Sequence, residues 1–456
     1  MNISGPLPWF STLWIKFFMK NWILLLLFIS PFFSTNIHSQ LKIEITEGVL
    51  DPVRIAIAPI DWNLNYPSRE YLHEVISSDL ESFGEFEALN PSEMLSLPRN
   101  EEEVFYRDWK LLDVDYLVVG TASQGKVSEQ VLVSFSIIDI AREKVLRRSI
   151  SSGTTKYLNS LAHVISDRIY EEINGIPGIY STKIIYVNKE KTLEGKYLLK
   201  LADIDGQNDS VIFSSYEPLM SPDWSSDGRR LAYVSFEEGS SKIYIQELYT
   251  GKRKGIKLEE GINSSPSWSP DDEFLSAVLS KSGNPDIYLY DLRKNSWKQL
   301  TDHYGIDTEP DWSPNGKKII FTSNRSGTPQ IYEMTLSNKK IRRKTFEGSY
   351  NARARYTPDG RNFIFVHRTN SLFHIAIQNL RTGKLRILTD TILDESPTIS
   401  PNGNVLIYAT KDKEENILAG ISIDGKTKFI LPTDLGEVRE PSWSPLLKQS
   451  RSNRLF

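Results

Sequence analysis

The sequence lacks the residues that most often carry metal and redox chemistry. Among its 456 residues there is no cysteine, and there are only six histidines. Disulfide bonds and thiolate metal sites are therefore excluded. The absence of cysteine suits an oxidising compartment, although cysteine-free cytosolic proteins also exist.

An excess of positive charge is also absent. Lys and Arg number 54 against 58 Asp and Glu, which gives a formal net charge of −4. This balance argues against a nucleic-acid partner. The one basic run, from Lys339 to Lys344, falls on a predicted outer strand, where charge discourages pairing between sheets.

The common catalytic motifs are missing as well. There is no H-E-x-x-H, no G-x-S-x-G and no glycine-rich phosphate loop. His73 and His163 fall on predicted helices, where surface or core roles are expected. His367 and His374 lie on consecutive predicted strands and form only a weak candidate metal pair. We therefore expect no cofactor, no metal ion and no enzymatic activity.

The second half of the chain instead contains a repeat of about 44 residues. One phrase, close to Pro-x-Trp-Ser-Pro-x-Gly, recurs with steps of 44, 44, 44, 43 and 44 residues. Its anchor positions are Trp224, Trp268, Trp312, Tyr356, Ile399 and Trp443. A period of this length with four strands per unit is typical of a β-propeller.

Each repeat contains the pattern of four strands. Apolar residues open β-rich runs seven and nineteen residues after the anchor, as at Leu231 and Ile243, and a weaker fourth run follows. The Pro-Asp-Gly and Pro-Asn-Gly pieces predict hairpin turns, because proline presets φ and glycine accepts positive φ. We expect the anchor aromatics to fill the space between blades rather than to stack on a ligand.

The register of the repeats predicts a closed ring of six blades. Six units of 44 residues need 264 residues, and the stretch 181–445 has 265. The run at Ile184 lacks an anchor phrase before it, and the phrase at Trp443 lacks strands after it. We therefore expect the Trp443 strand to complete the blade that begins at Ile184, which leaves no open edge.

Residues 1–39 have the pattern of a secretory signal peptide. Lys16 and Lys20 precede the uncharged apolar stretch 22–29, and small or polar residues lead to Ser39, where we expect cleavage. An uncleaved membrane anchor is the alternative. The apolar core is short for a span of about 20 residues, but the stretch 14–33 is apolar enough to keep this alternative open.

Residues 40–176 predict a small α/β domain. Strands are expected near 53–58, 116–119, 131–137 and 144–147, and helices from Ser68, over 101–112 and over 158–173. The segment 40–49 alternates apolar and polar residues, which predicts a leading strand that packs on its own domain or pairs with another chain. The propeller is expected over 177–446 and a tail over 447–456.

The anchor phrases resemble the repeats of the TolB family, periplasmic components of the Tol–Pal system of Gram-negative bacteria. The resemblance covers nearly the whole chain after residue 39. It is carried by the stretches 115–120, 218–224, 307–310, 393–397 and 441–445, and by the order of α/β domain and propeller.

The resemblance implies a binding protein. Family members bind the lipoprotein Pal on one propeller face and communicate with the inner-membrane protein TolA through the leading strand and first domain. They maintain the outer membrane and help it follow constriction during division. The implied Pal-binding residues are Leu219, Met220, Asn263, Ser264, Ser265, Asp307, Thr308, Glu309, Asn351, Ala352, Arg353, Asp394, Glu395, Arg439 and Glu440. The implied TolA-binding residues are Gln40, Leu41, Lys42, Ile43, Glu44 and Ile45.

Some alternatives stay open at this point. The fourth phrase lacks Pro and Trp, and Arg353 brings a positive charge to a position where relatives tend to be polar or acidic. The rim residues could be ordinary solvated loops. A periplasmic glycan-acting hydrolase that uses Glu309 or Glu395 is the rival function. For the protein as a whole we expect a periplasmic monomer that is not integral to the membrane.

Overall fold

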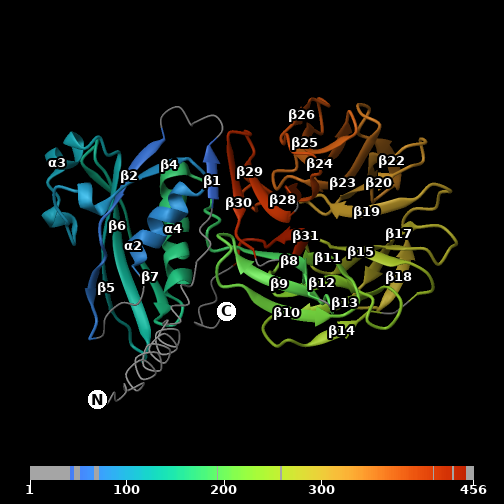
Figure 1. The fold of residues 1–456 in the computed structure, drawn as a ribbon, viewed down its shortest axis with the longest axis horizontal. Coiled ribbons are helices and arrows are strands. Elements are labelled where there is room, and N and C mark those ends of the chain that lie inside the picture. Colours follow the sequence, from blue (N-terminus) through green and yellow to red (C-terminus); the bar gives the residue numbers. More distant parts are fainter. Residues whose placement is uncertain are drawn as a thin grey trace, which may run out of the picture. The chain divides into compact units, whose positions relative to one another are not determined.

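The computed structural model describes residues 42–45, 52–65, 71–192, 194–256, 259–413, 415–433 and 436–447. The predicted signal peptide, Gln40, Leu41, Ser68 and all but the first residue of the predicted tail lie outside the described residues. Within the described part, an α/β domain precedes a six-bladed β-propeller (Figure 1). The predicted fold class is thereby confirmed.

The α/β domain is built on one mixed sheet with the order β4-β2-β5-β6-β7, in which β3 pairs with β5. Its strands are β2 (Val53–Ile57), β3 (Asp61–Asn63), β4 (Phe86–Leu89), β5 (Tyr116–Gln124), β6 (Gln130–Asp139) and β7 (Lys144–Thr154). β2 runs parallel to β4 and β5, whereas β5, β6 and β7 pair antiparallel. The short strands β3 and β4 were not predicted from the sequence.

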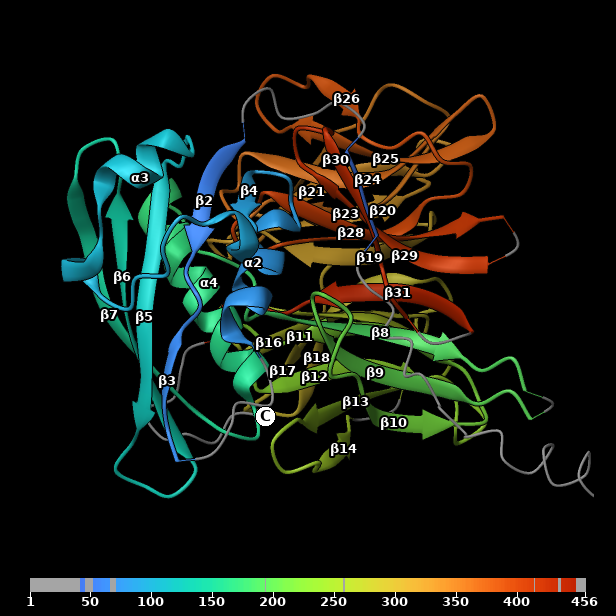
Figure 2. The same ribbon diagram turned by 60° about the vertical axis from the view of Figure 1, so that its left-hand side comes forward.

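Helices cover both faces of this sheet. α2 (Leu72–Glu81) and α4 (Leu158–Asn174) lie side by side on one face (Figures 1 and 2). Their apolar faces share one core with residues of the first and last blades, such as Ile184 and Phe429. The other face packs against Trp109 of α3 (Tyr106–Leu111), near the 3-10 turns η1 (Pro91–Glu93) and η2 (Glu101–Glu103). The single helix predicted over 101–112 is thus divided into η2 and α3.

The propeller has six four-stranded blades. The inner strands are β11 (Leu219–Trp224), β15 (Asn263–Trp268), β19 (Asp307–Trp312), β23 (Tyr350–Tyr356), β27 (Glu395–Ile399) and β31 (Glu437–Trp443). The second strands are β12 (Arg230–Ser235), β16 (Phe274–Leu279), β20 (Lys318–Ser323), β24 (Asn362–Thr369), β28 (Val405–Asp412) and β8 (Lys183–Lys189). The third strands are β13 (Lys242–Glu247), β17 (Asp286–Asp291), β21 (Gln330–Thr335), β25 (Leu372–Asn379), β29 (Glu415–Ser422) and β9 (Tyr197–Asp203). The outer strands are β14 (Arg253–Gly255), β18 (Ser296–Gln299), β22 (Lys340–Arg343), β26 (Leu385–Ile387), β30 (Thr427–Leu431) and β10 (Ser210–Ser215).

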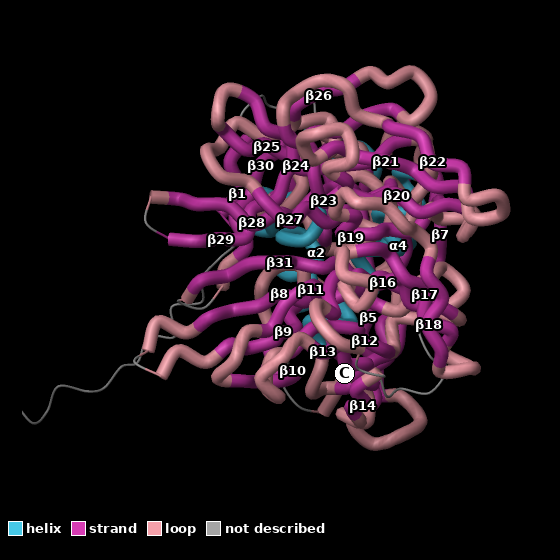
Figure 3. Tube along the Cα trace, turned by 90° about the vertical axis from the view of Figure 1, so that its right-hand side faces the viewer, coloured by secondary structure: helices cyan, strands magenta, loops and turns pink. Residues whose placement is uncertain are grey.

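The ring closes as the sequence predicts. β31, near the end of the described chain, pairs antiparallel with β8, and Trp443 stands opposite Ile184. Figure 3 shows the inner strands β11, β19, β23, β27 and β31 gathered round the middle of the ring. Closure by a strand from the far end of the chain ties the first and last blades together, so that the ring has no open edge at its join.

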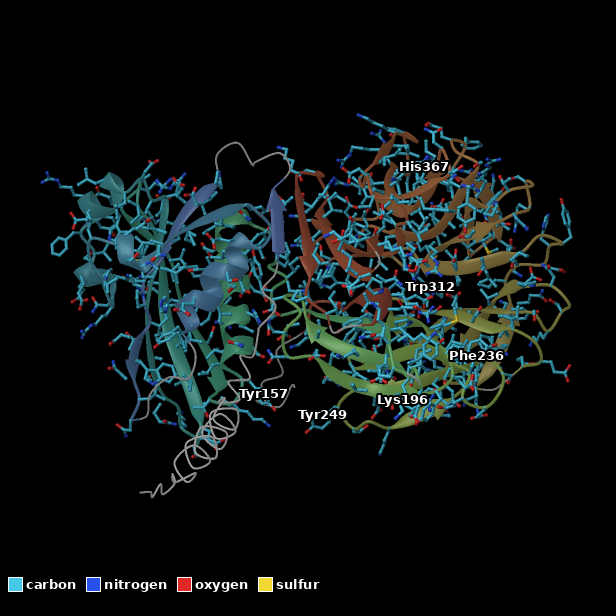
Figure 4. All side chains as sticks on the ribbon, in the orientation of Figure 1. Tyr157, Lys196, Phe236, Tyr249, Trp312 and His367 are labelled. Carbon is cyan, nitrogen blue, oxygen red and sulfur yellow. The ribbon has the colours of Figure 1, made fainter. Side chains whose placement is uncertain are left out.

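The anchor aromatics are scaffold residues, as predicted. Trp312 is buried, and its indole N–H donates to the Ser267 carbonyl at 3.2 Å and to Ser276 Oγ at 3.0 Å, both on the preceding blade. Trp224 makes a similar contact with the preceding blade, where its indole N–H donates to the Ser442 carbonyl at 3.1 Å. Figure 4 labels Trp312 among the side chains packed within the ring. The indoles of Trp224 and Trp312 therefore fill the space between blades while their N–H groups stay hydrogen-bonded. The buried indole N–H of Trp268 has no hydrogen-bond partner among the described residues.

The leading strand lies elsewhere than its place in the sequence suggests. β1 (Lys42–Ile45) pairs antiparallel with β30, with Lys42 opposite Ile430 and Ile45 opposite Thr427. It forms the fifth strand of the sheet β1-β30-β29-β28-β27, beside β30 in Figure 1. We assigned this segment to the α/β domain by its position in the sequence, whereas its backbone hydrogen-bonds to a propeller blade.

Candidate protein-binding face of the propeller

A β-bulge interrupts each of the six inner strands at the same place. The register shifts between Met220 and Asp223 in β11, and at the equivalent position of each other inner strand. The residue three places before each anchor has a left-handed φ between 47° and 55°; these residues are Ser221, Ser265, Glu309, Arg353, Ser396 and Glu440. Residues other than glycine rarely adopt this backbone conformation. Because a bulge re-aims a side chain, the six residues together line the mouth of the central channel.

Arg353 joins its own blade to three others across this mouth. Its Nε lies 3.0 Å from Glu309 Oε1 on β19, and its Nη2 lies 3.5 Å from Glu440 Oε1 on β31. It also donates to Ser396 Oγ on β27, and Glu440 accepts from the backbone N–H of Ser221. Burial alone would lower the pKa of Arg353, but Glu309 and Glu440 outweigh it and raise the pKa. The positive charge that the sequence places on the rim is therefore neutralised within the ring.

A second layer of charge lies deeper in the channel. Arg355 Nη1 lies 3.2 Å from Asp311 Oδ1, and Asp311 Oδ2 accepts from the backbone N–H of Tyr356 at 2.8 Å. Asp223 occupies the equivalent place two blades earlier and accepts from the backbone N–H of Trp268 at 2.8 Å. Burial raises the pKa of Asp223 to about 7, although Arg355 opposes the shift. Each of these carboxylates thus joins its own blade to the next.

The channel mouth holds too little space for an organic substrate. Its cavity measures about 60 Å³, whereas pockets for small molecules usually measure about 300–1,000 Å³. Glu309, a candidate catalytic carboxylate in the rival interpretation, is held by Arg353 and accepts from Thr322 Oγ1 at 2.8 Å. The geometry of the mouth therefore favours contact with a surface over enclosure of a ligand.

Seven of the fifteen predicted rim residues are buried: Leu219, Asn263, Asp307, Asn351, Ala352, Asp394 and Glu440. Four of them hold the loops in place from beneath. Asn263 donates to the Glu259 carbonyl at 2.8 Å, and Asp307 accepts from Arg325 at 2.6 Å. Asn351 donates to the Glu347 carbonyl at 2.8 Å, and Asp394 accepts from Thr410 Oγ1 at 2.6 Å. These side chains point into the protein rather than toward a partner.

The other eight predicted residues are exposed or half-buried: Met220, Ser264, Ser265, Thr308, Glu309, Arg353, Glu395 and Arg439. They come from all six inner strands and surround the channel mouth. Of the predicted leading-strand residues, Lys42, Ile43, Glu44 and Ile45 form β1, and Gln40 and Leu41 lie outside the described residues.

A set of exposed apolar side chains borders the mouth in the loops before β15, β19, β23 and β27, and the sequence interpretation missed it. Tyr304 is 84% exposed, Phe346 74% and Ile392 72%. With the exposed Ile262, Ile306 and Leu393 they form what we call the apolar rim. All six lie in loops that lead from an outer strand to the next inner strand, at the same end of the ring as the mouth. The signal in the sequence was an aromatic or aliphatic residue two to seven places before the polar rim residues of β15, β19, β23 and β27.

Exposed apolar side chains clustered on one face usually mark an interaction site. A polar centre bordered by apolar loops on a rigid scaffold is suited to bind another protein. None of the helices among the described residues is long and apolar enough to cross a lipid bilayer.

Comparison with known proteins gives a consistent result. The TolB beta propeller domain matches residues 170–447, and the TolB amino-terminal domain matches residues 41–146. The Tol-Pal system protein TolB of Alcanivorax borkumensis is 51% identical over 411 residues, which cover 90% of this chain and 94% of that protein. The protein of the same name from Pseudomonas aeruginosa is 49% identical over 407 residues, which cover 88% of this chain and 94% of that one.

A solved structure agrees with these sequence matches. The crystal structure of TolB from Acinetobacter baumannii superposes with a TM-score of 0.80 at 37% identity. The match covers 89% of this chain and all of that one. Both domains and most of the chain are therefore shared with these proteins, and the chain belongs to the TolB family.

Proposed function

We propose that the mouth of the propeller channel and its apolar rim bind the lipoprotein Pal in the periplasm. The observation that carries this proposal is the apolar rim, because the side chains of Tyr304, Phe346 and Ile392 stay largely exposed to solvent. Tyr304 contacts only the ring of His303 and the Arg325 carbonyl in the described structure, and Phe346 contacts only the guanidinium of Arg343. Membership of a family whose relatives are named for the Tol-Pal system supports Pal as the partner.

The chemistry of the rim suits a protein interface. Aromatic side chains are enriched among residues that dominate binding energy, and the polar groups around them fix orientation. Ser264, Thr308 and Glu395 provide hydroxyl and carboxylate groups between the apolar side chains. The internal pairing of Arg353 with Glu309 leaves the mouth without a strong net charge of its own. We therefore expect apolar contact, more than charge attraction, to supply most of the affinity.

We propose that the leading strand and the α/β domain bind TolA. The motivating observation is that, among the described residues, β1 is the outermost strand of its sheet and pairs only with β30. An edge strand presents unpaired backbone groups to which an extended segment of another protein can add. A chain that lacks residues 40–48 should lose TolA binding or change its Pal affinity, while thermal unfolding of the propeller stays nearly the same. Unchanged binding of both partners would contradict this assignment.

The wider role follows from these two contacts. We propose a non-catalytic protein, exported with a cleaved signal peptide over residues 1–39. It would work as a monomer that binds no nucleic acid and associates peripherally with membrane-anchored partners, without being integral to the membrane itself. By binding Pal and TolA it would maintain the outer membrane and its invagination during division. Edman sequencing of the mature protein should begin at Gln40, and an intact Met1 would instead support the membrane anchor.

A pull-down with Pal from the same organism tests the central proposal. We expect the folded protein to bind at micromolar concentration or below, and substitution of Phe346 by Ala to weaken binding. Tyr249→Ala is the matched control, because Tyr249 is also exposed but lies in a turn between a third and an outer strand, at the opposite end of the ring. Absence of binding by the folded protein would exclude Pal as the partner.

The same variants distinguish the rival hydrolase. Glu309→Gln and Glu395→Gln should change Pal affinity if these residues belong to an interface. In a hydrolase they should instead abolish turnover of peptidoglycan fragments. The small cavity at the mouth favours the first result.

A further inference from the structure

A buried cluster of His163, Asp203 and Asp205 links the α/β domain to the first blade. His163 lies on α4 and is fully buried. Asp203 ends β9, and Asp205 lies in the turn that follows. One side-chain atom from each of the three lies within 4.8 Å of those of the other two. The sequence interpretation gave His163 only a core or surface role.

The imidazole is held in one orientation by a carboxylate behind it. His163 Nδ1 lies 2.9 Å from Asp79 Oδ2 on α2, and Ser166 Oγ donates to the same oxygen at 2.6 Å. Because an ionised carboxylate only accepts hydrogen bonds, Nδ1 carries the proton. Burial lowers the pKa of His163, but Asp79, Asp205 and Asp203 outweigh it and raise the pKa to about 10. Nε2 is directed at Asp203 and Asp205, so a metal ion bound there would replace the Nε2 proton and take its lone pair. A histidine that ligates a metal almost always donates its other ring N–H to a carboxylate or carbonyl in this way.

The turn after β9 aims Asp205 at the imidazole. Asp205 Oδ1 accepts from the backbone N–H of Gln207 at 2.9 Å, which leaves Oδ2 facing His163. Gly206 in this turn has a φ of 81°, and a Cβ there would lie 2.5 Å from the Pro432 carbonyl oxygen. Glycine is therefore required for the turn to approach the last blade this closely.

The distances from His163 Nε2 to the two aspartates fit a shared metal ion better than a direct hydrogen bond. His163 Nε2 lies 3.8 Å from Asp203 Oδ2 and 3.8 Å from Asp205 Oδ2, and it has no hydrogen-bond partner. A hydrogen bond needs about 2.7–3.2 Å. Two ligands that each lie about 2.0–2.2 Å from one tetrahedral zinc ion stand roughly 3.3–3.6 Å apart. A shift of a few tenths of an ångström would therefore satisfy zinc.

The charge of the cluster also favours a cation. Asp79, Asp203 and Asp205 bring three carboxylates, and of these Asp203 pairs with Lys183 and also accepts from Asn208 at 2.8 Å. If the imidazole is neutral, the three carboxylates outnumber the one lysine, Lys183, that pairs with them. The buried cluster then has a net negative charge that needs a compensating cation. The Asp205 side chain is 29% exposed, which leaves a route for an ion and a water ligand.

We propose that His163 Nε2, Asp203 and Asp205 bind a zinc ion, with Asp79 orienting the imidazole. The donor set of one imidazole and two carboxylates suits zinc, and the nitrogen ligand disfavours magnesium and calcium. Bound there, the ion cross-links α4 to the first blade. This site goes beyond the binding of Pal and TolA and does not depend on it.

The test is zinc binding by the purified protein after dialysis against a chelator. With zinc chloride alone we expect one equivalent to remain bound after desalting, and a higher melting temperature. Asp205→Asn should weaken zinc binding at least tenfold while it preserves the acceptor for Gln207. Asp359→Asn is the matched control, because Asp359 accepts from the backbone N–H of Arg361 at 2.9 Å in the same kind of turn. Its zinc binding should match that of the unaltered protein.

Nitrogen-15 NMR of His163 gives a second measurement, which does not rely on a variant. Zinc should shift Nε2 while Nδ1 stays protonated, and calcium or magnesium at the same concentration should leave Nε2 unchanged. Equal zinc retention by the unaltered protein and Asp205→Asn would overturn the proposal. Absence of retained zinc, with both ring nitrogens protonated, would also overturn it and identify a buried imidazolium instead.

Discussion

Arg353 Nε lies 3.0 Å from Glu309 Oε1, and this contact joins two neighbouring inner strands at the mouth of the channel. The Arg353 backbone N–H also donates to Glu309 Oε2 at 3.0 Å. The two residues occupy equivalent positions, three places before the anchors of β19 and β23, and both have a left-handed backbone. One bulge, repeated in successive blades, thus brings opposite charges together where the blades converge.

Replacing Arg353 by Met should destabilise the ring. The change would leave Glu309 and the buried Glu440 without their cation, and removal of one partner of a buried pair is costly. Because Arg353 is partly open to the channel, we expect a loss of about 1–3 kcal/mol, measured by denaturant unfolding at neutral pH. Adding Glu309→Gln should recover part of the loss. Arg361→Met, at a well-exposed position, should have little effect.

Replacing Trp312 by Ala should unfold a blade, whereas Thr308→Ala should not. The indole fills the space between blades and donates two hydrogen bonds, so its loss should cost about 3–5 kcal/mol. Thr308 is half-buried on the rim of the same strand. Its substitution should change the stability by less than about 1 kcal/mol. Equal melting temperatures for the two variants would contradict the division between scaffold and binding surface.

Alanine at Tyr304 or Phe346 should weaken Pal binding by at least about tenfold, because buried aromatic anchors supply much of an interface's energy. Both side chains are exposed in the free protein, so their removal should leave the melting temperature unchanged. Isothermal titration calorimetry with Pal measures the effect. If Tyr249→Ala at the opposite end of the ring weakened binding equally, the apolar rim would not be the binding site.

Asp223→Asn should change how stability depends on pH. The pKa of Asp223 is raised to about 7 in the folded protein, above its value of about 3.9 in an unfolded chain. Its protonation therefore contributes stability that is fully present below about pH 4 and is lost as the pH rises through about 7. Asparagine at this position can still accept from the Trp268 N–H, and Arg355 keeps its ion pair with Asp311. We expect the variant to be more stable than the unaltered protein at pH 8 by about 1 kcal/mol, with a flatter profile from pH 5 to 8. Asp359→Asn should not alter the profile.

The sequence predicted the architecture well because the repeat has a fixed period. The phrase at Trp224 and its copies fixed the number of blades, and the unmatched ends at Ile184 and Trp443 predicted the closing strand. In the α/β domain, the apolar spacing along α4 predicted that helix to within a residue at its C-terminal end. The short strands β3 and β4 were missed, because three or four residues carry too little periodicity.

The candidate site could be predicted only in part. Sequence position identifies the loop before each anchor, but it does not show that Asn263 and Asp394 point inward and hold that loop. It also gives no sign that Arg353 meets carboxylates 44 and 87 residues away. Such contacts depend on the closed ring, as does the pairing of β1 with β30. Local sequence patterns do not encode them.

Hydrogen–deuterium exchange of the protein with and without Pal tests the central claim most directly. We predict that Pal slows exchange in the loops at 303–306 and 346–349, which carry Tyr304 and Phe346. Exchange in the turns at 225–229 and 248–252, at the opposite end of the ring, should stay the same. Protection of those turns, with unchanged exchange in the two loops, would contradict the assignment of the channel mouth as the Pal-binding face.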